Sequence, residues 1–192
     1  MTMTIGLLAF PQMEMLDYMY PYQVFTTAAQ ITETQSDKEI LLVTIAETSD
    51  CFEVRDGVPL QPQATIDDHL ELSCLIIPGG KAGVDLAIEG GRIAPWLEAQ
   101  AMCTAILASL STGTFLLAQT GLLNGLEATT SGEHIEELRR RFPAIDVVDR
   151  DWVESGRFLT ASCSSTGVDM ALHVVKRILS PEIAQATAER MK

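Results

Sequence analysis

The chain has 192 residues, of which 47% are hydrophobic and 20% are charged, proportions that exclude an intrinsically disordered chain. With 13 lysines and arginines against 26 aspartates and glutamates, the net charge is −13, which disfavours binding to nucleic acids and to anionic membrane surfaces. No apolar run reaches the ~18 residues of a membrane span, and residues 1–9 lack the basic region of a signal peptide. We therefore expect a single cytoplasmic domain over residues 1–192.

Apolar runs alternate with helical patterns along the chain. Asp56-Gly57 predicts a turn between two short extended pieces within residues 52–62. The alternation predicts an α/β fold with a mostly parallel sheet covered by helices on both faces. Strands are expected at 3–10, 40–46, 72–77, 103–110, 145–148, 152–153 and 157–160. Helices are expected at 15–30, 84–101 (broken at Gly90-Gly91), 112–120, 133–142, 166–179 and 181–190.

The cysteines and histidines do not predict a metal site. Cys51, Cys74, Cys103 and Cys163 are far apart and show no C-x-x-C spacing. Because Cys74 and Cys103 lie in apolar runs, we expect buried free thiols, as in a reducing cytoplasm, rather than disulfides. No histidine has metal-ligand spacing, and no glycine-rich phosphate loop is present, so neither a metal nor a nucleotide cofactor is expected.

Sheets of this kind carry their sites at the carboxyl ends of the strands, and one strand there runs directly into a helix. The segment Ser109-Leu110-Ser111-Thr112-Gly113 has small residues around Ser111, as in a nucleophile elbow that lifts one side chain above the sheet. The Thr112 amide would lie at the N-terminus of the following helix, where free N–H groups favour negative charge. Ser111 is equally compatible with a plain helix N-cap.

Three other strand ends carry polar groups. After Ile76-Ile77-Pro78, the amides of Gly79 and Gly80 are able to form an oxyanion hole with Thr112, although a simple turn explains the glycines as well. Glu14 and Asp17 follow the first strand in an apolar, aromatic setting that favours raised pKa values and proton transfer; their alternative role is capping the helix. The hydroxyl-rich turn at 160–169 is suited to lining a pocket or to capping the last large helix.

The order of these stretches resembles the ThiJ/PfpI superfamily of the class I glutamine amidotransferase-like fold, over about residues 5–190. The most specific pieces are Leu16-Asp17-x-x-x-Pro21, Ile76-Ile77-Pro78-Gly79-Gly80 and Ser111-Thr112-Gly113. An Asp four residues before the proline looks like the isocyanide hydratase branch. The stretch 110–118, followed by Ala128-Thr129-Thr130, is similar to the sensor domains of AraC-type regulators.

This resemblance implies a three-layer α/β/α fold, a homodimer, and a cysteine nucleophile hydrogen-bonded to a carboxylate near the first strand. The matching positions are Ser111 and Asp17, and the amides of Gly79, Gly80 and Thr112 match the positions that stabilise an anion. The chain departs from the family pattern because no cysteine stands at the elbow and Ser131 replaces the histidine that follows the two threonines. His134 is expected to point elsewhere, and Cys163, beside the pocket, is not expected to be the nucleophile.

Two functions follow from these residues. The first is an isocyanide hydratase-like or related hydrolytic enzyme, in which Asp17 handles protons and Ser111 lies near the substrate carbon. The second is a dimeric binding or regulatory protein that kept the pocket but lost the nucleophilic thiol. Both take a small molecule as partner. A DNA-binding role is not expected, because the charge is unsuitable and no helix-turn-helix segment is expected within the chain.

Overall fold

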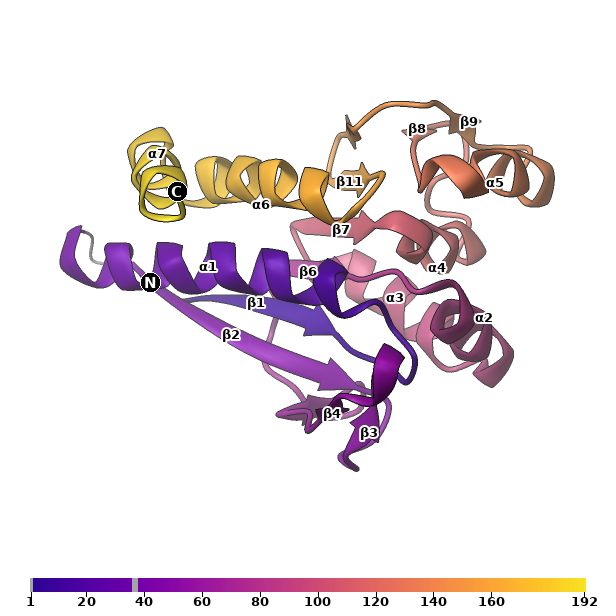
Figure 1. Cartoon of the computed structure of the whole chain (residues 1–192), viewed down its shortest axis with the longest axis horizontal. Coiled ribbons are helices and arrows are strands. Elements are labelled where there is room, and N and C mark those ends of the chain that lie inside the picture. The colour runs from indigo at the N-terminus through magenta and orange to yellow at the C-terminus, as the bar shows by residue number, and fades with distance from the viewer. Residues whose placement is uncertain (1, 36–37) are drawn as a thin grey trace.

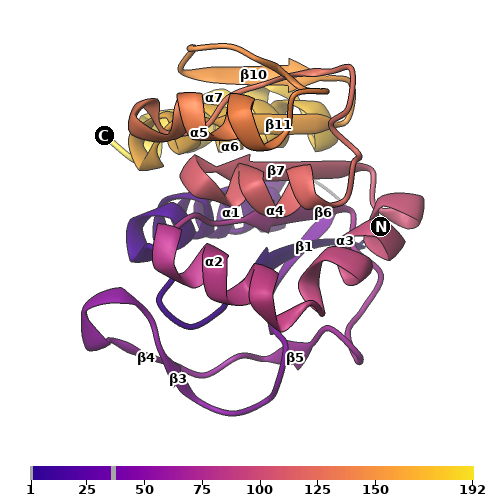
Figure 2. The ribbon, with the colours of Figure 1, turned by 90° about the vertical axis from the view of Figure 1, so that its right-hand side faces the viewer.

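A computed structural model describes residues 2–35 and 38–192. Within these ranges the main sheet has seven strands in the order β10-β11-β7-β6-β1-β2-β5, which Figure 2 shows stacked from β10 down to β5. Every neighbouring pair is parallel except β10 and β11, so the predicted mostly parallel sheet is confirmed. The strands are β1 Thr2–Leu8, β2 Glu39–Ala46, β5 Ala64–Thr65, β6 Cys74–Ile77, β7 Ile106–Leu110, β10 Trp152–Ser155 and β11 Phe158–Ala161.

Two groups of helices flank the sheet and confirm the three-layer α/β/α arrangement (Figure 1). Helices α1 (Met15–Gln35), α6 (Ser164–Ile178) and α7 (Pro181–Arg190) pack on one another. The second group is α2 (Lys81–Gly90), α3 (Ile93–Cys103) and α4 (Thr114–Gln119). The remaining elements are the hairpin of β3 (Phe52–Glu53) and β4 (Pro59–Leu60), the pair β8 (Glu127–Ala128) and β9 (Asp146–Val147), and α5 (Ile135–Arg141).

Most predicted elements are found, and the glycine break is one of them. Helix α2 ends at Gly90, and the following Gly91 has φ 72°, the left-handed conformation that glycine adopts most easily at a helix end. The predicted hairpin turn is also present, since β3 and β4 pair antiparallel around residues 55–57. The first helix extends past the predicted residue 30 to Gln35, and the two-residue strands β5 and β8 were not predicted.

The centre of the sheet is the core of the molecule. All residues of β6 and β7 are buried, as are all but the first of β1. Strands covered on both faces read as continuous apolar runs, and this is why the sequence predicted them. No helix within the described ranges is long and apolar enough to cross a membrane.

The carboxyl ends of β6 and β7 are held close together by a glycine. A Cβ atom placed on Gly113 would lie 2.5 Å from the carbonyl oxygen of Pro78 and 2.6 Å from that of Ile77. Only glycine allows the turn after β7 to approach the turn after β6 this closely, because real Cβ atoms do not approach oxygen to these distances. Figure 1 shows the arrowheads of β1 and β7 pointing toward the same side, where the candidate site lies.

We predict that Gly113→Ala lowers the free energy of unfolding by about 1–3 kcal/mol, because the added methyl group overpacks a rigid backbone contact. Gly113 has φ −56°, so the loss would be steric and not conformational. Gly132→Ala is the matched control, since a Cβ atom there meets nothing within 4 Å. Urea denaturation measures both variants, and equal stabilities would contradict this account of the turn.

Candidate active site

Ser111 lies at a strained turn between β7 and α4. Its φ is 50°, a left-handed value that is uncommon for a residue with a side chain and that costs free energy. The 3-10 turn Ser111–Gly113 starts after Leu110 and has no side-chain cap. This geometry favours the elbow interpretation over the N-cap interpretation, because an N-cap residue has extended backbone and accepts an amide hydrogen bond.

A cavity of about 370 Å³ opens at this turn. Four of the five site residues predicted from the sequence line it: Asp17, Gly80, Ser111 and Thr112. They come from α1, from the turn after β6 and from the turn after β7, which meet at the carboxyl edge of the sheet. The fold therefore brings together residues that are far apart in the sequence, as expected for a parallel α/β sheet.

Asp17 is the buried titratable group of this cavity, with 1% of its surface exposed. Its Oδ2 accepts a hydrogen bond from the Gly79 amide at 3.0 Å, and its Oδ1 accepts one from the Ser164 hydroxyl at 2.5 Å. Burial raises the pKa of Asp17 from 3.8 to about 6. The two hydrogen bonds lower the pKa but do not offset burial, and the nearby charge of Glu14 raises it slightly. A carboxyl group with this pKa exchanges protons near neutral pH.

Two of the three predicted oxyanion-hole amides are already hydrogen-bonded inside the protein. The Gly79 amide donates to Asp17, and the Gly80 amide donates to the Thr112 hydroxyl oxygen at 3.0 Å. The Thr112 amide is therefore the strongest remaining candidate for stabilising an anion. Within the described ranges, the hydrogen bonds of the Asp17 carboxyl go to Gly79 and Ser164 and none goes to Ser111.

Residues outside the five predicted site residues also line the cavity, including the hydroxyl-rich turn for which the sequence predicted pocket lining or capping. Ser164 lines it and connects the Asp17 carboxyl to its interior; the sequence signal was only the hydroxyl-rich turn. His134 lines it too, whereas the sequence predicted that this side chain points elsewhere. The 3-10 turn Gly132–His134 folds the chain back, and His134 Nδ1 hydrogen-bonds the Ser131 hydroxyl at 2.7 Å.

Cys163 contributes a thiol to the cavity. It is the N-cap of α6, and its Sγ lies 3.2 Å from the Ser165 hydroxyl and 3.6 Å from that of Thr166. Partial burial raises the pKa of this thiol, but hydrogen bonds from Ser165 and Thr166 outweigh it, so the pKa falls from 9.0 to about 7. A thiol with this pKa is substantially ionised at neutral pH.

The other cysteines partly follow the expectation. All four are free, as predicted, but only Cys74 is buried. Burial was wrongly predicted for Cys103, which is the last residue of α3 and is exposed although its neighbours in the sequence are apolar. In the part of the chain that the structure describes, no three His, Cys, Asp or Glu residues are grouped as metal ligands.

The rim of the cavity is charged. Arg55 forms an ion pair with Glu14 at 2.7 Å, and both line the opening. Lys81, at the first position of α2, pairs with Asp85 and lies 3.5 Å from Glu137. Since these pairs are partly exposed, they contribute little to stability. The opening of the cavity therefore carries both positive and negative side chains rather than charges of one sign.

The fold and this cavity define a class of α/β protein whose site lies at the carboxyl ends of parallel strands around a strained strand-to-helix turn. A model of the DJ-1/PfpI family matches residues 3–177. The isonitrile hydratase of Pseudomonas putida is 30% identical over 185 residues, which are 96% of this chain and 76% of the hydratase. The chain belongs to the DJ-1/PfpI family, which confirms the resemblance seen in its motifs.

Regulators are also among the relatives. The HTH-type transcriptional regulator GbdR of Pseudomonas aeruginosa is 29% identical over 135 residues, 70% of this chain but only 36% of the regulator. A solved ThiJ/PfpI family protein from Pseudomonas syringae has a TM-score of 0.86 at 21% identity, covering 100% of this chain and 75% of its own. A solved AraC family transcriptional regulator from Pseudomonas putida has a TM-score of 0.83 at 18% identity, and the match covers 99% of this chain and 100% of the regulator chain. These two structures support the fold alone.

The raised pKa of Asp17 predicts a specific dependence of stability on pH. Between pH 4 and 6 the folded protein holds a proton on Asp17 that the unfolded chain releases, so the free energy of unfolding falls as pH rises. The loss, of order 3 kcal/mol, is complete above the folded pKa of about 6. Asp17→Asn cannot ionise at this position, so the variant should not show this loss of stability.

Urea denaturation of the native chain and of Asp17→Asn across this pH range measures the effect. The native chain should lose stability relative to the variant as pH rises. If the difference in unfolding free energy between the two proteins stays constant with pH, or changes in the opposite direction, the pKa of Asp17 is not raised.

The lowered pKa of Cys163 predicts its alkylation. Iodoacetamide should modify this thiol faster than Cys51 or Cys103 at pH 7, with a rate that rises to half its maximum near pH 7. Mass spectrometry of peptides after timed quenching measures each site. Replacement of Ser165 by alanine should move the midpoint to higher pH, since the Ser165 hydrogen bond lowers the pKa; no movement would contradict the assigned cause.

Proposed function

We propose that this chain is an enzyme that adds water to a small molecule, or hydrolyses one, in the cavity of Asp17 and Ser111. Asp17 is the acid and base, and Ser111 lies next to the reacting carbon. The observation that carries the proposal is the buried Asp17 carboxyl, which has a pKa of about 6 and lines the same cavity as the strained Ser111 turn. Perturbed carboxyls in clefts are common among catalytic acids.

An isocyanide is the substrate class that we propose, by analogy with the isonitrile hydratase relative. Its terminal carbon accepts a proton and then the oxygen of water, so that R–N≡C and H₂O give R–NH–CHO with no other reactant. Protonated Asp17 would supply the proton to carbon, and its carboxylate would recover one from the adding water. The Thr112 amide would donate a hydrogen bond to the substrate nitrogen, where a lone pair develops as water adds to the protonated carbon.

Ser164 gives the buried acid a connection to the cavity. Its hydroxyl donates to Asp17 Oδ1 and also lines the cavity. A proton can therefore pass between the carboxyl and a bound substrate through one side chain, without exposure of Asp17 to bulk water. This explains how a carboxyl that is 1% exposed can take part in catalysis.

A second candidate function is non-catalytic binding of a small molecule by a regulatory relative of the enzymes. The specific observation in its favour is the elbow residue, because a serine hydroxyl needs an adjacent general base and the hydrogen bonds of Asp17 go elsewhere. The engaged amides of Gly79 and Gly80 point the same way. The similarity to GbdR fits this function as well.

We further propose a homodimer located in the cytoplasm. Leu16, Met19 and Tyr20 of α1 are all exposed, and their spacing places them on one side of the helix. Leu16 also lines the cavity, so a partner copy on this face would lie beside its opening. The four free cysteines fit a reducing compartment.

Turnover of an aryl isocyanide tests the enzymatic proposal. The purified chain should convert it to the N-aryl formamide, observed by ¹H NMR, and Asp17→Asn should lower the rate at least tenfold because the proton donor is lost. Ser111→Cys is assayed beside it, because a thiol at this position would restore the nucleophile of the family pattern and would reveal an activity that needs one.

The outcomes separate the two functions. Formamide production that depends on Asp17 supports the enzyme. No formamide from the native chain or from Ser111→Cys, together with recovery of unmodified isocyanide, would overturn the hydratase and leave the binding function.

A further inference from the structure

A second cavity, of about 400 Å³, lies on the other side of the loop that follows β1. Pro11 of that loop lines the second cavity and Glu14 lines the first, so residues 9–14 separate the two. The volume is within the range of small-molecule sites. Nothing in the proposed reaction uses this cavity, and the inference below is independent of the proposed function.

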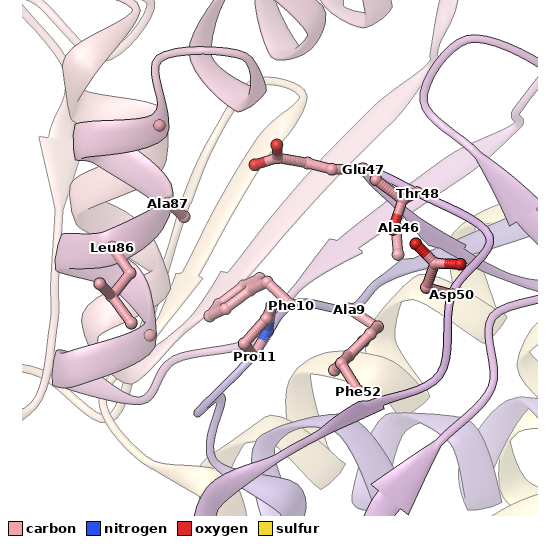
Figure 3. Close-up of a pocket in the computed structure, with 12 residues that line it drawn as sticks. Ala9, Phe10, Pro11, Ala46, Glu47, Thr48, Asp50, Phe52, Leu86 and Ala87 are labelled. Carbon is pink, nitrogen blue, oxygen red and sulfur yellow. The ribbon is translucent and has the colours of Figure 1, made fainter.

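The walls of the second cavity are mainly apolar and aromatic. Figure 3 shows the rings of Phe10 and Pro11 between Leu86 of α2 and Phe52 of the β3–β4 hairpin. One face of α2 leaves room for the cavity, because three of its four lining positions are glycine or alanine and the fourth is Leu86. Helical spacing places Gly83, Ala87 and Gly90 on that face. A ligand would therefore meet two aromatic rings and a groove of small residues.

The mouth of the second cavity is negatively charged. Glu47 and Asp50 line it, and Figure 3 shows the Glu47 side chain reaching across toward α2. In residues 2–35 and 38–192, neither carboxylate forms an ion pair. Arg92 is near, since it donates to the Glu47 carbonyl at 3.2 Å, but its guanidinium pairs with Asp67 at 2.7 Å.

The end of α2 adds to this negative potential. A Cβ atom on Gly90 would lie 3.8 Å from the Glu47 carboxylate, which places that carboxylate beside the last turn of the helix. A helix C-terminus carries a partial negative charge, and α2 has no basic residue in its last turn. With a chain net charge of −13, the site repels anions and attracts cations.

We propose that this second cavity binds a small organic cation, an alkyl- or arylammonium whose apolar part lies against Phe10, Phe52 and Leu86 and whose charge lies at the mouth that Glu47 and Asp50 line. The aromatic rings favour such a ligand because they bury its apolar part. A neutral ligand would leave the two carboxylates unpaired, and an anion would be repelled.

Three probes of matched size test the proposal: benzyltrimethylammonium, benzyl alcohol and benzoate. Isothermal titration calorimetry gives the affinities, and amide NMR shifts give the location. We expect the ammonium probe to bind at least tenfold more tightly than benzyl alcohol and to shift amides of residues 46–52 and 83–90. Benzoate should not bind there.

Charge variants test the carboxylates. The double replacement Glu47→Gln and Asp50→Asn should weaken ammonium binding at least tenfold. Glu89→Gln is the matched control, since it removes one negative charge from the same helix end without touching the cavity lining; its effect should be below twofold. An equal loss in the control would show attraction by net charge alone and would overturn the site.

A filling variant tests the cavity itself. Gly90→Leu should abolish ammonium binding, and it is compatible with the fold because a Cβ atom at Gly90 meets nothing closer than 3.8 Å. Asp17→Asn, in the first cavity, should leave binding unchanged, which separates this inference from the proposed reaction. Unaltered binding by Gly90→Leu, tighter binding of benzyl alcohol, or no binding of any probe at millimolar concentration would each overturn the proposal.

Discussion

The candidate site depends on one buried carboxyl group. Asp17, at the start of α1, accepts hydrogen bonds from the Gly79 amide after β6 and from the Ser164 hydroxyl at the start of α6. These two bonds connect three segments that are far apart in the sequence, and they replace the water that burial removes from the carboxyl. Burial still outweighs them, so the pKa is about 6. The same contacts that join the segments thus produce a proton-exchanging group.

Sequence patterns predicted the sheet because its central strands are buried on both faces, which leaves a continuous apolar run in each. They predicted the locations of Asp17 and Ser111 because a parallel sheet brings strand ends to one edge. Hydrogen-bond partners were not predictable in this way. Whether the Gly79 amide donates to Asp17 or stays available to a ligand depends on the orientation of one peptide plane, which no spacing of residues encodes. The place of His134 along the cavity lining follows from a 3-10 turn at residues 132–134, which the spacing of residues does not encode either.

The cavity combines a strained turn that carries a hydroxyl group with a thiol that comes from another element. Ser111 has the strained left-handed backbone of the turn, and Gly113 allows the close approach of two strand ends. The thiol of lowered pKa in the cavity belongs instead to Cys163, at the start of α6. Proton exchange by Asp17 is therefore the part of the proposed chemistry that this chain supports most strongly, and both candidate functions need the cavity that surrounds it.

The central claim is that Asp17 carries an exchangeable proton near neutral pH, and a direct titration of its side chain tests this. With ¹³C-labelled aspartate, the carboxyl signal assigned to Asp17 through its loss in Asp17→Asn can be followed by NMR as the pH is changed. The account predicts a midpoint of about 6. A midpoint near the ordinary value of 3.8 would show that the carboxyl is ionised throughout the neutral range and would contradict its role as an acid.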